Sequence, residues 1–535
     1  MTGRKIFLTL ALAMSGIISS YAQGKIDLGP KSPIRKLQIA EFAINALYVD
    51  SLDENKLVEN AINGMLKNLD PHSSYSSAQE VKKLTEPLEG SFEGIGIQFN
   101  MADDTLLVIQ PVSGGPSEKK GILAGDRIVK VNDTIVAGVK MNRDEIVRRL
   151  RGPKGSKVKL GIVRRGIAGI QDFTVVRDKI PVNSVDASYM VDKSTGYIRL
   201  NNFGATTHDE FTKKIKELRE KGMKSLILDL QGNGGGYLSA AVDIANEFLN
   251  KDDMIVYTSG RSTKRQDFTA KGNGIYTSGK VLVLVDEYSA SAAEILTGAI
   301  QDHDRGLVIG RRTFGKGLVQ RPISLPDGSM IRLTVSHYYT PSGRCIQKPY
   351  KMGDKLSYDM DVINRYKNGE LTNADSIHFA DSLKFKTLRL GRTVYGGGGI
   401  MPDIFVALDT TRFTKLYKEL AVKGCIINTN LKYVDKHRKK LMKTYSSFDE
   451  FNSSFEVPED MIDILKDYAE KEKIEYTDST FNEAMPMVKL QLKALVARDL
   501  WDMNEYYHVI NVSNPIYTKA VEVIKDDKYF KEISE

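Results

Sequence analysis

Apolar strands that alternate with amphipathic helices over residues 196–302 constrain the fold most strongly. Three strand and helix pairs make up this stretch: GYIRL (196–200) before a helix at 208–222, SLILDL (225–230) before a helix at 237–250, and KVLVLVD (280–286) before a helix at 291–302. Strands that are apolar on both faces must be covered on both faces, and intervening helices indicate a parallel sheet. The sequence therefore predicts an α/β core.

Two other patterns precede this core. Residues 34–88 carry apolar side chains at three- and four-residue spacings, which is typical of helices. From about residue 90, short strands alternate with turns that contain Gly and Pro, and helix-like pieces occur after Pro116 and at 142–152. We expect a unit of six strands and two helices there.

Beyond about residue 410 the chain is rich in Lys, Glu and helix formers, and residues 481–510 are expected to form one long helix. We divide the chain into five parts. They are a signal peptide (1–22), an N-terminal helical segment (28–89), a small domain (90–178), the α/β core (181–408) and a helical C-terminal extension (409–535).

The first residues have the features of an export signal. Arg4 and Lys5 precede a short apolar run at 6–18, and SSYA (19–22) ends in small residues suited to cleavage. The run is too short for an ordinary membrane helix, and no later stretch is apolar enough for one. We expect an exported protein with no membrane span in the mature chain.

Composition adds two limits. Cys345 and Cys425 are the two cysteines of this 535-residue sequence, so the fold does not depend on a disulfide framework, and their pairing stays open. The net charge of +8 is small for this length and spread along the chain, which argues against nucleic acid as a partner.

The stretch GRRTFGKG (310–317) fits G-x-x-x-x-G-K, the opening of a phosphate-binding loop. Such a loop needs Ser or Thr after the lysine and a helix that begins there. Here Gly317 follows, and residues 318–340 are expected to form a hairpin with a Pro-Asp-Gly turn. This pattern argues against a nucleotide site, so Lys316 needs another role.

Lys316 can act as a base if it is buried. An ordinary lysine has a pKa of about 10.4 and stays charged at neutral pH, but burial in apolar surroundings lowers that pKa by several units. Phe314, Leu318 and Val319 provide apolar flanks. The alternative is a solvated loop lysine beside two glycines.

Ser291 is the candidate nucleophile. With Glu294 it forms S-x-x-E, the pattern of a capping box, which by itself predicts only a helix start. The same position places the hydroxyl at the positive end of a helix dipole. A serine nucleophile also needs a base, and Lys316 or a histidine of a conventional triad, His303 or His337, could supply it.

Several motifs, in this order, resemble the C-terminal processing peptidases, also called tail-specific proteases. They are LDPHSSY (69–75), FEGIGI (92–97), LDLQGNGGG (228–236), SASAAEI (289–295), TFGKGLVQ (313–320), YYTPSGRCIQ (338–347) and GGGGIMPDI (396–404). The resemblance covers roughly residues 35–408. It implies a crotonase-like α/β core and a serine endopeptidase with Ser291 as nucleophile, Lys316 as general base and Gln320 as the residue that orients the lysine.

The same resemblance matches the GNGGG stretch to the oxyanion loop of the family. Gly234 or Gly235 would then donate a backbone amide to the oxyanion alongside Ala292. No metal and no cofactor is expected. The family usually has Arg where this chain has Gln231, which puts a salt bridge from that position in doubt. The role of the extension after residue 408 is left unassigned.

Residues 90–178 resemble a PDZ domain, with a small β-barrel as the alternative. By that resemblance the amides of Gly94, Ile95, Gly96 and Ile97 bind the C-terminal carboxylate of a peptide, which adds a strand to the sheet edge. Partners would be protein or peptide substrates with free C-termini. An activating partner or a homo-oligomer stays open, and the family suggests that the domain moves.

Together these features favour an exported endopeptidase that cleaves proteins near their C-termini, in the periplasm of a Gram-negative cell. A non-catalytic PDZ adaptor on a protease scaffold is the alternative from another class. Intact Ser291, Lys316 and Gln320 argue against it.

Overall fold

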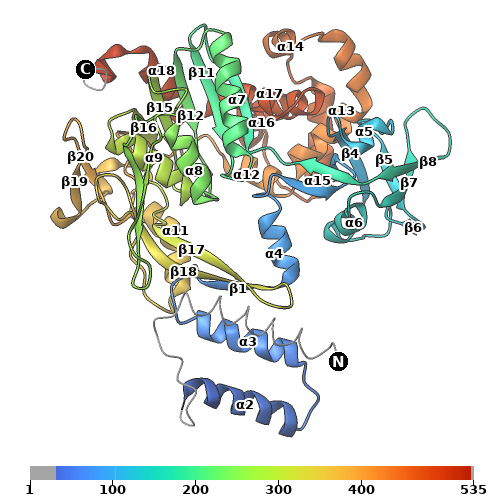
Figure 1. The fold of residues 1–535 in the computed structure, drawn as a ribbon. Helices are drawn as coiled ribbons and strands as arrows, with labels where there is room; N and C mark the ends of the chain where they lie inside the picture. The colour runs from blue at the N-terminus through green and yellow to red at the C-terminus, as the bar shows by residue number, and fades with distance from the viewer. Residues whose placement is uncertain (1–31, 103, 532–535) are drawn as a thin grey trace. The chain divides into compact units, whose positions relative to one another are not determined.

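The computed structural model describes residues 32–102 and 104–531, so the predicted signal peptide at 1–22 lies outside the described residues (Figure 1). The chain divides into two compact units, Met1–Leu69 and Asp70–Glu535. The first unit holds helices α2 (Pro33–Leu47) and α3 (Glu54–Leu66), as the apolar spacing predicts. Pro33 occupies the first turn of α2, where its missing N–H costs nothing.

A six-stranded sheet forms the centre of the second unit, in the order β10-β11-β12-β15-β16-β21. Its strands are β10 (Val185–Met190), β11 (Thr195–Leu200), β12 (Ser225–Asp229), β15 (Lys280–Val285), β16 (Leu307–Gly310) and β21 (Ile404–Phe405). Neighbouring strands are parallel except for β10, which runs antiparallel to β11. The predicted α/β core is confirmed.

Helices cover both faces of this sheet. One face packs against α7 (Thr207–Glu220), α8 (Leu238–Asn246) and α9 (Ala292–Asp302). The other face packs against α18 (Pro515–Lys525) of the C-terminal extension. Strands buried on both faces explain the nearly continuous apolar runs in the sequence. The C-terminal residues are therefore part of the same hydrophobic core as the sheet.

A second, antiparallel sheet lies beside the core sheet and contains the expected hairpin. Its strands are β1 (Ser74–Ser76), β13 (Met254–Ser259), β14 (Gln266–Thr269), β17 (Leu318–Ser324) and β18 (Met330–Tyr339). Strands β17 and β18 pair directly across the Pro326–Gly328 turn. A strand, and no helix, therefore follows Lys316, which removes the nucleotide-binding interpretation.

The small domain has the six strands and two helices that the sequence predicts. They are β3 (Ile97–Ala102), β4 (Thr105–Pro111), β5 (Arg127–Val131), β6 (Thr134–Ile135), β7 (Lys157–Val163) and β8 (Ile170–Val176), with α5 (Pro116–Lys119) and α6 (Arg143–Leu150). A two-stranded ribbon of β2 (Ser91–Gly94) and β9 (Asp178–Pro181) joins it to the rest of the unit. Its apolar core is separate from that of the central sheet.

The C-terminal extension is helical, but one prediction about it is wrong. Residues 481–510 do not form one helix: α16 (Asp478–Leu500) ends before Trp501, and α17 (Met503–Ile510) begins anew. The Asp502 carboxylate accepts a hydrogen bond from Met503 N at 2.7 Å and so starts the second helix. The earlier helices are α12 (Lys415–Val422), α13 (Cys425–Thr444), α14 (Phe448–Ser454) and α15 (Glu459–Lys471).

Helix α13 also contacts the small domain. Asp435, which is nearly buried, forms ion pairs with Arg127 at 2.9 Å and Arg165 at 3.1 Å. Leu431 packs against Leu107 and Ile109 of β4. The extension therefore touches both the small domain and the central sheet.

The remaining elements are short. They are α4 (Ala78–Thr85), α10 (Lys355–Asp359), α11 (Asp361–Lys367), β19 (Lys384–Lys386), β20 (Thr393–Tyr395), and the 3-10 turns Ala374–Ser376, Asp381–Leu383, Asn511–Ser513 and Asp527–Tyr529. Cys345 and Cys425 are free thiols. Within residues 32–102 and 104–531, no helix has the length and apolarity needed to cross a bilayer.

Candidate active site

Ser291 lies where the central sheet passes into a helix. It follows β15 and forms the N-cap of α9, with φ of 57° and ψ of −113°. A positive φ is rare for serine and marks a backbone held by its surroundings. Ser289, by contrast, is fully buried, and its hydroxyl donates to the Leu230 carbonyl at 2.8 Å. The structure gives Ser289 a structural contact and leaves Ser291 half-buried at the helix start.

Glu294 connects Ser291 to the lysine loop. Its Oε2 accepts hydrogen bonds from the backbone N–H of Ser291 at 2.8 Å and of Lys316 at 2.9 Å. Its Oε1 accepts from Thr313 Oγ1 at 2.5 Å and Gly315 N at 2.8 Å. One fully buried carboxylate therefore holds two segments whose reactive residues lie 25 positions apart.

The hydrogen-bond donors around Glu294 indicate whether its carboxyl group is ionised or protonated. Burial raises the pKa of this carboxyl, while the hydrogen bonds it receives oppose that change. All four neighbours donate to its oxygens, and a protonated carboxyl would direct its own O–H toward a donor. The geometry therefore suits an ionised Glu294.

Lys316 has the electrostatic setting of a proton acceptor. Burial, with a smaller effect from the charge of Arg332, lowers the pKa of its ammonium to about 8, against the opposing effects of Glu294 and Asp70. Within the described residues the Lys316 ammonium has no hydrogen-bond partner. A lysine with this pKa is partly neutral near pH 7 and can take a proton.

A second lysine nearby is paired instead. Lys348 is almost completely buried, and its Nζ lies 3.0 Å from Asp361 Oδ2 and 3.2 Å from the Tyr358 carbonyl. It also lies over the Phe314 ring, 3.8 Å from the centroid. Burial lowers the pKa of Lys348, but the charge of Asp361 and its hydrogen bond oppose that change, so Lys316 is the better candidate base of the two.

Gln320, the predicted orienting residue, lies on β17, four residues after Lys316. The Gln320 Nε2 is buried and has no hydrogen-bond partner among the described residues. A register shift between Val319 and Gln320 breaks the regular pairing of β17 with β18 at this point. The orienting role of Gln320 stays a prediction.

The glycine loop packs directly against Ser291. A Cβ on Gly235 would lie 2.8 Å from Ser291 Cβ and 2.9 Å from Ala292 N, and the φ of Gly235 is +100°. Only glycine allows this approach. The Gly235 N–H donates to Asn233 Oδ1 at 2.9 Å, whereas the amides of Gly234 and Ala292 have no acceptor among the described residues. Of the two candidate glycine donors, Gly234 is therefore the free one.

The histidines considered as bases have other partners. His303 Nε2 is 2.6 Å from the Met254 carbonyl, and His337 Nδ1 is 3.9 Å from Cys345 Sγ. His72 lies in the field of Lys316, but burial lowers its pKa to about 3, so it stays neutral. Its Nε2 is 2.8 Å from the Tyr358 hydroxyl.

Sequence reasoning missed part of the framework around Ser291 and Lys316. Gln347 Oε1 accepts from Gly317 N at 2.8 Å, and the Tyr338 hydroxyl donates to the Ser291 carbonyl at 3.2 Å. Asp70 accepts from Thr334 Oγ1 at 2.8 Å, which fixes the 69–75 stretch on β18. The motifs at 69–75 and 338–347 contain some of these residues, but no local sequence pattern predicts which distant residues they contact.

The predicted peptide-binding residues of the small domain line a groove. Gly94, Ile95, Gly96 and Ile97 border a cavity of about 470 Å³ together with residues of α6 such as Val147. The α4 side of this cavity carries an ion pair of 3.0 Å between Lys83 and Asp144. A groove between β3 and α6 is suited to an added peptide strand. No cluster of metal-ligating residues occurs within the described part of the chain.

Comparison with known proteins identifies this arrangement. Residues 194–358 match peptidase family S41, residues 94–175 match the PDZ domain, residues 17–80 match the activating protease CtpB N-terminal domain, and residues 416–502 match a family of unknown function. The resemblance stated from the motifs is confirmed.

Individual relatives agree with these matches. The carboxy-terminal-processing protease of Bartonella bacilliformis is 40% identical over 351 residues, which are 63% of this chain and 79% of that protein. The carboxy-terminal processing protease CtpA of Bacillus subtilis is 38% identical over 371 residues, covering 68% of this chain and 78% of that protein. The solved photosystem II D1 C-terminal processing protease is 30% identical and covers 58% of this chain and 83% of that chain, with a TM-score of 0.32.

The chain belongs to peptidase family S41 and is therefore a serine peptidase. Within that family it is a carboxy-terminal processing protease that carries a PDZ domain, an N-terminal helical domain like that of CtpB and a helical C-terminal region.

Proposed function

We propose that Ser291 and Lys316 form the catalytic dyad of this protease. Neutral Lys316 accepts the proton of the Ser291 hydroxyl while Oγ attacks the peptide carbonyl carbon, and the π pair of that carbonyl moves onto its oxygen. Collapse of the tetrahedral intermediate breaks the C–N bond, and the Lys316 ammonium returns the proton to the leaving amine. Water then hydrolyses the acyl-enzyme by the same steps.

The observation that carries this proposal is the shared carboxylate. Glu294 binds the backbones of both residues, and Lys316 has a pKa near 8. In the proposal Gly234 and Ala292 donate their amides to the oxyanion, and Gln320 orients the lysine in the substrate-bound state. The buried, unpaired Gln320 amide supports that last role. We also propose that the α/β core has a crotonase-like fold.

The PDZ domain, in this proposal, binds the free C-terminus of a substrate through the Gly94–Ile97 amides. The groove between β3 and α6 supports this role. A strand spans about 3.3 Å per residue, so a bound C-terminus lets upstream residues extend toward Ser291. Protein and peptide chains with free C-termini are therefore the proposed substrates.

Export to a periplasm and assembly with a second copy are also proposed. The apolar run at 6–18 supports export. Helix α2 supports assembly, because large apolar side chains along it are exposed, among them Ile39, Phe42 and Leu47. Exposed apolar surface of this kind favours a protein partner.

Cleavage of a disordered test protein tests the dyad. Ser291→Ala and Lys316→Ala should each abolish cleavage, and the double variant should show no further loss, because the pair acts as one unit. Ser289→Ala is the matched control and should keep substantial activity. Normal cleavage by Ser291→Ala, with Ser289→Ala inactive, would move the nucleophile to the other serine.

Peptides with free and amidated C-termini test the PDZ role. The amidated peptide should bind more weakly, because it lacks the carboxylate that the loop amides accept. Binding of the free C-terminus without any cleavage by the intact protein would favour the adaptor function. Equal binding and cleavage of the two peptides would remove C-terminal capture.

A further inference from the structure

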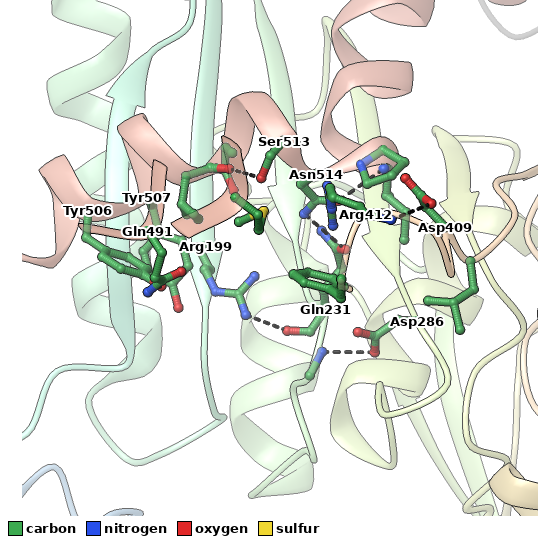
Figure 2. A pocket seen from close by; sticks show the side chains of 18 of the residues that line it. Arg199, Gln231, Asp286, Asp409, Arg412, Gln491, Tyr506, Tyr507, Ser513 and Asn514 are labelled. Carbon is green, nitrogen blue, oxygen red and sulfur yellow. Dashed lines mark hydrogen bonds between the residues drawn. The ribbon is translucent and has the colours of Figure 1, made fainter. Parts of the chain in front are cut away.

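A cavity lies beside the loop that is proposed to bind the oxyanion, and Ser291 is not among the residues that line it. It has a volume of about 430 Å³, and the loop residues Gln231 and Gly232 line it together with residues of the C-terminal region such as Asn514 (Figure 2). Protein interiors are normally close-packed, so a loop backed by a cavity is not held in place by packing on that side. Hydrogen bonds must hold it instead.

Gln231 is one of the loop residues that make such bonds, and the Gly232 N–H also donates to Asp286 Oδ1 at 2.9 Å. The Gln231 backbone N–H and Nε2 both donate to Asp229 Oδ1, at 2.8 and 3.1 Å. Its carbonyl accepts from Arg199 at 2.7 Å, and that guanidinium also pairs with Asp229 at 2.6 Å. These contacts of Gln231 come from β11 and β12, within the sheet itself.

One further bond to Gln231 comes from the far end of the chain. The Asn514 Nδ2 donates to Gln231 Oε1 at 3.2 Å, across 283 residues of sequence. Asn514 is itself fixed, because its Oδ1 caps α18 by accepting from Ile516 N at 3.0 Å. Helix α18 is in turn anchored by Ile516 and Tyr517 in the apolar face of the central sheet.

From Gln231 the contacts lead directly to the site. Asn233, two residues on, accepts from Ala290 N at 2.9 Å through its carbonyl and from Gly235 N at 2.9 Å through its side chain. Ala290 directly precedes Ser291, and Gly235 packs against Ser291. A displacement of the loop would therefore move the amide proposed to hold the oxyanion.

We propose that Asn514 is a positioning residue of this protease, which holds the oxyanion loop in place through Gln231. The C-terminal region then contributes to the active site, because its Asn514 holds the loop through Gln231. Gln231 fits this role, since its amide oxygen accepts from Asn514 whereas the usual Arg of the family has no acceptor. The proposal rests on the proposed function, because it assumes that the loop binds the oxyanion.

The test compares two asparagines of the same region. Asn514→Ser keeps a good N-cap for α18 but cannot reach Gln231. Asn511→Ser is the matched control, because Asn511 donates to the Tyr189 hydroxyl at 2.9 Å and makes no contact with the loop. Each change removes one hydrogen bond between the C-terminal region and the core, and since the Asn511 bond is buried and the Asn514 bond partly buried, Asn511→Ser should cost at least as much stability.

The expected result is specific to the transition state. Asn514→Ser should lower kcat roughly three- to tenfold with KM nearly unchanged, as loss of one hydrogen bond allows. Affinity for a peptide aldehyde, whose serine adduct places an oxyanion in the loop, should fall by the same factor. Asn511→Ser should leave kcat and aldehyde affinity within about twofold of wild type, because the hydrogen bond from Asn511 to Tyr189 does not connect to the loop.

A double variant tests the route through Gln231. Asn514→Ser should have no further effect in a Gln231→Met background, because the acceptor is already gone. Should Asn514→Ser fold poorly, Asn514→Asp keeps both shape and cap but cannot donate, and its kcat should fall at least as far. Equal kcat losses in Asn514→Ser and Asn511→Ser, or full kcat in Asn514→Asp, would overturn the proposal.

These outcomes are separate from failure of the proposed function. If Ser291→Ala cleaves normally, the dyad is wrong and the positioning role is overturned with it. If Ser291→Ala is inactive while both Asn514 variants keep wild-type kcat, the dyad stands and the positioning role is overturned alone.

Discussion

The pH dependence of cleavage follows from the pKa of Lys316. In the proposed dyad only the neutral amine can accept the Ser291 proton, so kcat/KM should rise with pH until Lys316 is fully deprotonated. The positive charge of Arg332 lowers this pKa, so replacing Arg332 should shift the pH at which kcat/KM rises (the rising limb of the pH profile). In Arg332→Met the pKa of Lys316 should rise, because the charged amine is no longer repelled, and the limb should shift to higher pH.

The size of the effect follows from the value near 8. With that pKa, about 9% of Lys316 is neutral at pH 7 and about 91% at pH 9, so kcat/KM should rise roughly tenfold across this range. An unshifted lysine of pKa 10.5 would be about 0.03% neutral at pH 7, so the lowered pKa raises the neutral fraction roughly 300-fold.

The same shift has a cost in stability. Between pH 8 and 10.5 the unfolded chain binds the Lys316 proton and the folded chain does not, so the free energy of unfolding rises with pH across this window. The buried Lys316 ammonium therefore destabilises the fold fully below about pH 8, and this destabilisation has disappeared above the unfolded pKa. The total is about 3 kcal/mol, the equivalent of the shift in pKa.

The assay is the initial rate of cleavage of a peptide without titratable side chains, measured from pH 6 to 10 at constant ionic strength. His303→Ala and His337→Ala are the controls, and both should keep the limb. Loss of the limb in either histidine variant would favour a conventional triad. A limb that stays in place, or moves to lower pH, in Arg332→Met would refute the electrostatic reasoning.

The remaining predictions concern packing and stability. Gly235→Ala should lower kcat by about 100-fold or more, because the new Cβ would meet Ser291, and full activity would contradict this packing. Glu294→Gln should lower the free energy of unfolding by about 3 kcal/mol in urea titrations, because an amide cannot accept from all four donors. An unchanged urea midpoint would argue against that network. Lys316→Met should be inactive yet more stable than wild type at pH 7, since it removes a buried charge, and a lower urea midpoint would contradict this. Asp435→Asn should increase hydrogen exchange in β4 and α13, because it weakens two ion pairs with the small domain, and unchanged exchange would argue against a specific contact.

Local patterns were enough to predict the elements around the site. Strand and helix periodicity gave the core sheet, and the Pro-Asp-Gly turn gave the β17–β18 hairpin, because each depends on residues close in sequence. The S-x-x-E pattern placed Ser291 at a helix start for the same reason. The single helix expected at 481–510 failed because Asp502 competes for a backbone amide, a local effect that apolar spacing does not report.

What the sequence by itself determined is the order of elements and the type of residue at each reactive position. Only the tertiary structure decided that Glu294 binds both the serine and the lysine segments, and that the Gln320 Nε2 has no hydrogen-bond partner in the described part of the chain. It also decided that α18 covers the core sheet and that Asn514 reaches Gln231. These features depend on which distant segments pack together, and a lysine pKa near 8 exists only once that packing has excluded water.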